Sequence, residues 1–336
     1  MGCRLLGGNT AFLRTSCVAF VIAGCGTAVP LEDRTPHATD RPSPVAIPLT
    51  ALESADVLAL DDQNIYWVNA STHDSGAIYD VRTMPKSGIG GPVTLATGEG
   101  WATALVVDDR SLYFNTRRCV GGSCFLSRDN CSTMRVRKSG GMSEIFVRGG
   151  AGGLSLDSKA IFVGGVSREN SLLHVDKGTG AVGDMRDGSL PESIAVLGDS
   201  LVWTTNEPAW NAVLQTAVPG AADESKRAYI TVDDVAGPVA IDGDGVFVRT
   251  KSSILRADLK ARQITPITSV TSAGVADLAA GDGTLYWNDE ASLSAVSKDG
   301  THPRSLDTAG KVYGQIRLDA QSIYFLRDGQ VFRLQR

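Results

Sequence analysis

One pattern recurs seven times along this chain: an apolar strand, a short turn rich in Asp or Gly, and a second strand that usually carries aromatic residues. The seven copies begin at Val57, Ala104, Gly153, Ser193, Pro238, Asp277 and Gln315. Corresponding positions of the second strand lie 38 to 49 residues apart. A period of about 43 residues with several short strands per unit is typical of a β-propeller blade.

The first strand of each unit has large apolar residues on either side of one middle position. That position is occupied by Ala59, Val106, Ser155, Ala195, Ala240, Ala279 and Arg317. Because side chains alternate along a strand, the middle residues share one face. Small residues on that face indicate seven inner strands converging on a narrow axis. The sequence therefore predicts an all-β, seven-bladed β-propeller of four-stranded antiparallel blades.

The last unit has a third strand at residues 331–334 and then ends, so it has no fourth strand of its own. Residues 45–49, which follow Pro44, match the fourth strand at residues 93–97, which follows Pro92. We expect this N-terminal segment to complete the last blade and to close the ring, since closure leaves only short sheet edges.

The segments Tyr66-Trp67-Val68-Asn69 and Tyr286-Trp287-Asn288-Asp289 resemble YWTD-type and related TolB- and NHL-like propeller repeats. The resemblance extends over residues 45–336, and the chain looks like the repeat-bearing lipoproteins of myxobacterial genomes. It implies a fold rather than an activity, since the aromatic pair is core. The receptor-type YWTD propeller has six blades, so its ligand-receptor role is not carried over.

The N-terminus has the features of an export signal. Arg4 and Arg14 precede an uncharged, mostly apolar stretch at residues 15–24, which is too short for a membrane-spanning helix. Its end, Ile-Ala-Gly-Cys25, resembles the lipobox of bacterial lipoproteins and implies cleavage of residues 1–24 and lipidation of Cys25. A plain signal peptide with an incidental cysteine is the alternative. An Asp at position 26 would imply retention in the inner membrane. Gly26 therefore favours anchoring in the outer membrane or at the cell surface, and the periplasmic face of the membrane is the alternative.

Residues 25–44 then form a lipidated cysteine and a tether, because this Pro-rich stretch has almost no large apolar side chains. Fully extended, the tether spans about 60 Å. The net charge of −5 argues against nucleic-acid binding. We expect a monomer held to the membrane by its lipid.

Three cysteines, Cys119, Cys124 and Cys131, lie in one insertion of the second unit. An exported loop is oxidising, so we expect a Cys119–Cys131 disulfide with Cys124 free, and Cys119–Cys124 as the second choice. A metal site is the other interpretation, although structural zinc usually takes four ligands and no His is near.

The turn acids, such as Asp61 and Asp108, could suggest calcium, but each turn offers only one or two. We interpret them as turn residues that accept local backbone N–H groups. The four histidines fall in different parts of the repeat pattern, and no G-x-S-x-G, Walker or H-E-x-x-H motif occurs. No cofactor and no metal are therefore expected.

Arg317 is the one large residue at the middle position, so we expect it in the central channel. It could be solvated, coordinate an anion, or pair with an acid, and Asp277 is the nearest candidate partner, followed by Asp56 and Glu192. Asp56 and Glu192 occupy the same pore-mouth position in nonadjacent units. Two acids are too few to define a catalytic site.

The sequence thus favours a noncatalytic binding or scaffold module whose protein or glycan partner is unknown. A propeller lyase or hydrolase with an axial metal is the first alternative. The second is a carbohydrate- or peptidoglycan-binding propeller, for which exposed Trp101 and Trp210 would be the ligand-facing aromatics.

Overall fold

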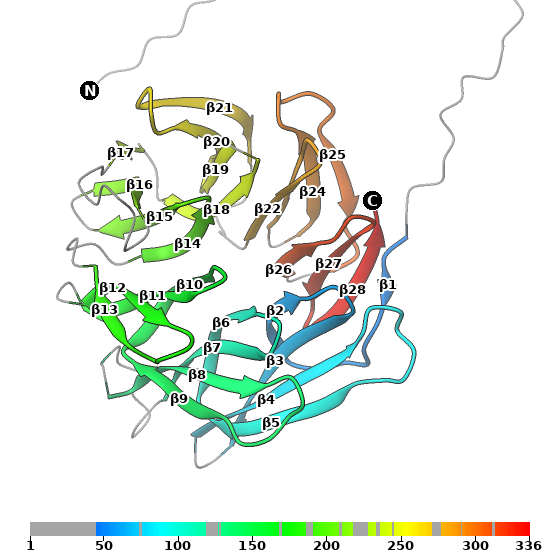
Figure 1. Ribbon diagram of the computed structural model, residues 1–336. Helices are drawn as coiled ribbons and strands as arrows, with labels where there is room; N and C mark the ends of the chain where they lie inside the picture. Colours follow the sequence, from blue (N-terminus) through cyan, green and yellow to red (C-terminus); the bar gives the residue numbers. More distant parts are fainter. Residues whose placement is uncertain are drawn as a thin grey trace, which may run out of the picture. The chain divides into compact units, whose positions relative to one another are not determined.

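Strands joined by turns make up the described part of the protein in the computed structural model (Figure 1). The described residues are 45–336 without 74–75, 119–126, 128, 168–169, 186–190, 208–209, 218–227, 233–235, 244, 271–276, 290 and 311–312. Residues 1–44, which hold the predicted signal, Cys25 and the tether, lie outside them. Within the described residues, no helical segment has the length and apolarity that a membrane span requires.

The described strands form seven antiparallel sheets of four strands each, which we number as blades in chain order. Blade one contains β2 (Ala55–Leu60), β3 (Asn64–His73), β4 (Gly76–Pro85) and β5 (Val93–Glu99). Blade two contains β6 (Trp101–Val107), β7 (Ser111–Arg117), β8 (Cys131–Arg137) and β9 (Glu144–Arg148). Blade three contains β10 (Gly150–Leu156), β11 (Ala160–Ser167), β12 (Asn170–Asp176) and β13 (Val182–Asp184).

The remaining sheets continue the same order. Blade four contains β14 (Pro191–Leu197), β15 (Ser200–Glu207), β16 (Trp210–Ala217) and β17 (Ala228–Thr231). Blade five contains β18 (Ala236–Asp242), β19 (Gly245–Thr250), β20 (Ser253–Asp258) and β21 (Gln263–Ser269). Blade six contains β22 (Asp277–Gly281), β23 (Thr284–Asn288), β24 (Leu293–Ser297) and β25 (Arg304–Asp307). Blade seven contains β26 (Tyr313–Leu318), β27 (Ser322–Arg327), β28 (Gln330–Gln335) and β1 (Ile47–Pro48).

The first strand of each repeat is the innermost strand of its blade (Figure 1). The inner strands contact one another in the order β2, β6, β10, β14, β18, β22 and β26, and β26 also contacts β2. β1 pairs with β28, with Ile47 opposite Arg333 and Pro48 opposite Phe332. The fold is an all-β propeller with four-stranded antiparallel blades, as the repeat predicts.

The two members of each aromatic pair pack on opposite sides of their blade. Tyr66 belongs to the cluster that joins blades one and two, whereas its neighbour Trp67 packs with Tyr324 and Leu326 of blade seven. The same division separates Tyr286, toward blade seven, from Trp287, toward blade five. Successive strand residues point to opposite faces, so one aromatic pair supplies core to two interblade contacts. The interpretation of this pair as core is confirmed.

Candidate functional site

The inner strands share an irregularity near their starts. Six of the seven described inner strands have a β-bulge or similar register shift there. A bulge bends a strand, takes backbone groups out of the ladder and redirects side chains. The polar residues at these strand starts therefore become available to the neighbouring blade and to the axis.

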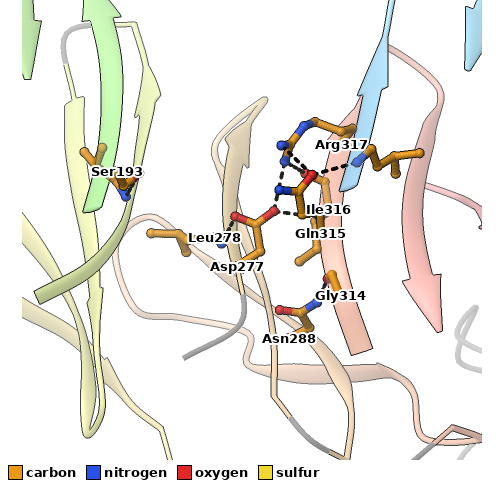
Figure 2. A network of polar contacts seen from close by, with 10 residues as sticks. Ser193, Asp277, Leu278, Asn288, Gly314, Gln315, Ile316 and Arg317 are labelled. Atoms are coloured by element: carbon orange, nitrogen blue, oxygen red, sulfur yellow. Dashed lines mark hydrogen bonds and ion pairs between the residues drawn. The ribbon is translucent and has the colours of Figure 1, made fainter. Parts of the chain in front are cut away.

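Polar side chains at the starts of three inner strands, two of them irregular, accept a hydrogen bond from the backbone N–H of the next inner strand. The pairs are Ser193 Oγ with Val239 N at 3.1 Å, Asp277 Oδ2 with Ile316 N at 2.8 Å, and Gln315 Oε1 with Leu58 N at 2.7 Å. Ser193, Asp277 and Gln315 occupy the same position of their repeats. This recurring bond, which we call the interblade latch, fixes the spacing of the strands around the axis (Figure 2).

A cavity of about 490 Å³ opens among six of the inner strands, β6 to β26. We call it the axial cavity. Its polar side chains come from Thr103, Glu192, Ser193, Asp277, Gln315 and Arg317. Its aliphatic side chains include Leu105, Leu154, Ile194, Val239 and Leu278, all nearly buried. These five also fill the space between blades, as expected for the residues that flank the middle position.

Arg317 lines the axial cavity, as its place in the repeat predicts, and the carboxylate that it binds is that of Asp277. Arg317 Nη1 lies 2.9 Å from Asp277 Oδ2 and donates to the carbonyl of Ile316, while Nη2 donates to Gln315 Oε1 at 3.0 Å (Figure 2). The Arg317 side chain is 32% exposed and that of Asp277 is 14% exposed. The guanidinium is thus held by an ion pair within a latch rather than being merely solvated.

The other two acids named from the sequence take no part in this network. Glu192 lines the axial cavity, and burial raises the pKa of its carboxyl. Asp56, the second residue of β2, lies outside the cavity lining, and burial raises the pKa of its carboxyl to about 6. Both side chains are exposed by surface area. Water therefore reaches both carboxylates, while the surrounding protein still removes part of their hydration.

The tryptophans lie in strands rather than in loops. Trp101 is the first residue of β6, opposite Arg117, and its side chain is partly buried and outside the cavity lining. Its pairing extends the ladder beyond the repeated pattern. Trp210 begins β16, opposite Glu207, and its side chain lies outside those described.

Cys131 is a free, buried thiol, and the predicted Cys119–Cys131 disulfide is not shown. It begins β8 opposite Arg117, and its backbone N–H donates to the carbonyl of Ser127. The side chain is therefore part of the packed sheet rather than of the insertion, and burial raises the pKa of its thiol. Cys119 and Cys124 lie outside the described residues.

The turn acids do bind local backbone groups, as expected. Asp61 Oδ1 accepts the N–H groups of Gln63 and Asn64, while Oδ2 accepts the hydroxyl of Tyr66 at 2.7 Å. Burial alone would raise the pKa of Asp61, but these bonds together with Lys138 lower it to about 2. Asp108, Asp157 and Asp319 accept backbone N–H groups in the same way.

A cation directly after the third strand of five blades pairs with a turn acid of the preceding blade. The pairs are Lys86–Asp319, Lys138–Asp61, Lys177–Asp108, Lys298–Asp242 and Arg336–Asp282. Lys86, Lys138, Lys298 and Arg336 also lie over an aromatic ring of that preceding blade. The sequence interpretation did not include these pairs, although a Lys or Arg at one fixed place in the repeat was a visible signal.

A second interblade contact was also missed. In three blades, the polar residue that follows the aromatic pair donates to the carbonyl of a glycine in the next inner strand. The pairs are Asn115 with Gly152, Thr204 with Gly237, and Asn288 with Gly314. The Asn of the Tyr-Trp-Asn-Asp segment is therefore a connector between blades, which fixes the strand starts that surround the axial cavity.

The two histidines whose side chains are described, His174 and His302, lie in different blades. His174 lies in β12 with its ring 5.5 Å from that of Phe162, and His302 lies in a turn with φ 55° beside the hydroxyl of Thr301. Among the described residues there is no group of three or more His, Cys, Asp or Glu side chains arranged to hold a metal ion.

Solved structures with similar folds are β-propellers of different functions. A catalytically inactive virginiamycin B lyase from Staphylococcus aureus with quinupristin has 12% identity, a TM-score of 0.65, and coverage of 87% of this chain and 99% of its own. BamB from Moraxella catarrhalis has 11% identity and a TM-score of 0.52 over 84% of this chain and 85% of its own. Sqt1 from Saccharomyces cerevisiae has 9% identity and a TM-score of 0.53 over 87% and 98%.

No protein-family model and no curated protein matches the sequence. At these identities the likeness to solved structures shows the propeller fold alone.

Proposed function

We propose that this protein is an exported, lipid-anchored β-propeller that binds an envelope or extracellular partner without catalysis, through the face that contains the axial cavity. The observation that supports this proposal is that most polar side chains of the axial cavity are hydrogen-bonded to neighbouring strands. These side chains already form hydrogen bonds that link neighbouring inner strands; they are those of Ser193, Asp277, Gln315 and Arg317. Groups fixed in this way form a rigid, preorganised surface, which suits recognition.

A site-specific photo-crosslinker tests this assignment. Placed at Thr103, on the cavity lining, it should capture a partner in native envelopes of the expressing cell. Placed at Lys260, an exposed turn residue between β20 and β21, it should capture none. Mass spectrometry of the adducts identifies the partner. Equal capture from both positions, or capture from Lys260 alone, contradicts binding through the axial face.

Lipid anchoring at Cys25 is the second part of the proposal, and the Ile-Ala-Gly-Cys segment after a short apolar stretch supports it. Metabolic labelling with palmitate should mark the wild-type chain, and the Cys25→Ala variant should lose the label and appear as a soluble or unprocessed form. Cys17→Ala, a cysteine within the same apolar stretch, is the matched control and should keep the label. A Cys25→Ala protein that still partitions into detergent contradicts the anchor. With Gly26 next in sequence, fractionation should place the labelled protein in the outer membrane or at the cell surface.

The third part is a closed ring of seven blades with β1 as the closing strand. The pairing of β1 with β28, the bond from Leu49 N to Val331 O at 2.9 Å and the contact between β2 and β26 support it. Closure would leave each blade flanked on both sides, which removes the exposed core that an open propeller has.

A lyase or hydrolase with an axial metal is the second candidate. The similarity to the fold of virginiamycin B lyase, over 99% of that chain, favours it. Calorimetric titration with Ca²⁺ and Zn²⁺ distinguishes the enzyme from the binding module. Stoichiometric metal binding that is lost in the Glu192→Gln and Asp277→Asn variants would favour the enzyme.

A further inference from the structure

Glu192 is the charged side chain of the axial cavity with no ion pair or hydrogen bond among the described residues. Burial is the only cause that shifts the pKa of its carboxyl. The strands on either side of β14 bring no charge to it, since β10 and β18 contribute Gly152, Gly153, Gly237 and Pro238 to the lining.

The charged groups that face Glu192 across the cavity are Asp277 and Arg317, which neutralise each other at 2.9 Å. The described lining therefore contains one uncompensated negative charge. A nearby cation stabilises a partly desolvated carboxylate. We therefore expect the carboxylate of Glu192 to favour binding of a positively charged ligand.

The rest of the lining indicates what kind of cation fits. The five large aliphatic side chains of the lining are nearly buried between blades, so the apolar groups open to the cavity are the partly exposed Ala104, Val106 and Pro238. A hard metal ion takes six or more oxygen ligands, whereas an ammonium group needs one charged acceptor and leaves its hydrocarbon part to aliphatic contacts. A volume of about 490 Å³ lies within the range of small-molecule sites.

We propose that the axial cavity binds a small organic ammonium ion, with the carboxylate of Glu192 as its counter-charge and the aliphatic lining around its hydrocarbon part. This inference rests on the proposed function only in using the same cavity for binding. It requires neither the lipid anchor nor a macromolecular partner.

Amide chemical-shift titration of the unlipidated chain without residues 1–24 and with Cys25→Ser tests the proposal, with n-butylammonium as the probe. At about pH 7.5 the probe should shift resonances of cavity residues such as Gly153 and Thr103. Its neutral and anionic counterparts, 1-butanol and butanoate, should shift them far less. Because burial raises the pKa of Glu192 above its ordinary value, the carboxyl should take up a proton and binding should weaken as the pH is lowered from about 7.5 toward about 4.5.

Variants separate the role of the charge from that of the fold. Glu192→Gln should weaken n-butylammonium binding about tenfold, the loss of one charge-assisted hydrogen bond. Glu192→Asp keeps the charge and should keep the pH dependence. Asp199→Asn, an exposed acid in the turn after β14, removes the same charge outside the cavity and should bind as wild type.

Three results would overturn the inference: equal shifts from 1-butanol, unchanged binding by a folded Glu192→Gln variant, or loss of binding by the Asp199→Asn control. If n-butylammonium binds as expected while the Thr103 photo-crosslinker captures nothing, the proposed function fails and the ammonium site stands. If a partner is captured from Thr103 while n-butylammonium does not bind, the ammonium site fails and the proposed function stands.

Discussion

Asp277 Oδ2 accepts the backbone N–H of Ile316 at 2.8 Å and lies 2.9 Å from the guanidinium of Arg317. One carboxylate of blade six therefore satisfies both a backbone donor and a charge of blade seven. Two latches in other blades use a hydroxyl and an amide at the same position, so a polar acceptor matters there more than its charge.

We predict that Asp277→Ala lowers the free energy of unfolding by about 2–3 kcal/mol, because it leaves the backbone N–H of Ile316 without its acceptor and Arg317 without its ion-pair partner. Asp277→Asn keeps an acceptor and should cost about half as much. Urea unfolding measures both. The exposed Asp199→Ala is the control and should change stability by less than about 0.5 kcal/mol. An Asp277→Ala protein as stable as this control would contradict the latch.

A second prediction concerns Asp61, whose side chain is 20% exposed and whose pKa is lowered from 3.8 to about 2. A folded pKa below the unfolded one stabilises the protein above about pH 4, and this contribution is lost as the pH falls toward 2. Allowing for solvent screening, Asp61→Asn should cost about 1 kcal/mol at pH 7 and almost nothing at about pH 2. Unfolding curves at several pH values check this. A cost that is independent of pH would mean that the carboxylate charge is not what stabilises the turn.

Asp56 should behave in the opposite sense. Its pKa is raised to about 6, so ionisation opposes folding, and stability from this residue is lost as the pH rises through 6. Asp56→Asn should therefore raise the melting temperature at pH 7 and leave it unchanged at about pH 4. Asp62→Asn, an exposed acid in the adjacent turn, should have little effect at either pH. A lower melting temperature for Asp56→Asn at pH 7 would show that this carboxylate has a stabilising partner.

Asn115 links strands within and between blades. Its side chain is fully buried, donates to the carbonyl of Gly152 at 2.9 Å and accepts the hydroxyl of Thr133 at 2.7 Å. Asn115→Ala should cost about 2–3 kcal/mol, since it leaves a buried carbonyl and hydroxyl unpaired. In a double-mutant cycle with Thr133→Val, the coupling energy should be about 1 kcal/mol. Additive effects of the two substitutions would contradict the network.

Deletion of residues 45–49 should lower the melting temperature by roughly 5 °C, because it removes the strand beside β28 and a hydrogen bond to Val331. Differential scanning calorimetry measures the change. Deletion of residues 33–37, an equal length of the tether, is the control. If both deletions leave the melting temperature unchanged, β1 does not contribute to closure.

The fold could be predicted because its signals repeat. The aromatic pair, the turn acid and the apolar first strand each follow from strand alternation and turn chemistry, which are local rules, and seven copies exclude coincidence. Arg317 could be placed at the axis for the same reason: it departs from a pattern that the other six units define.

Contacts between repeat units were harder to predict from the sequence. Asp277 could be named as a partner for Arg317, but its bond to Ile316 depends on a bulge that no sequence rule locates. The burial of Cys131 could not be predicted, because loop spacing says nothing about which side chain turns into the sheet. Glu192 could be placed at the pore mouth, yet its isolation depends on which neighbours happen to be glycine or proline.

The cation pairs between blades also bear on how such a chain arises. Each of blades one and two contains both a turn acid, Asp61 or Asp108, and a lysine after its third strand, Lys86 or Lys138, that serves the blade before it. A repeat of this kind contains both an acid and a cation of the type that joins neighbouring blades. Duplication of such a repeat by unequal recombination would therefore give the new junction its own acid and cation, so a blade can be added during evolution without a new contact.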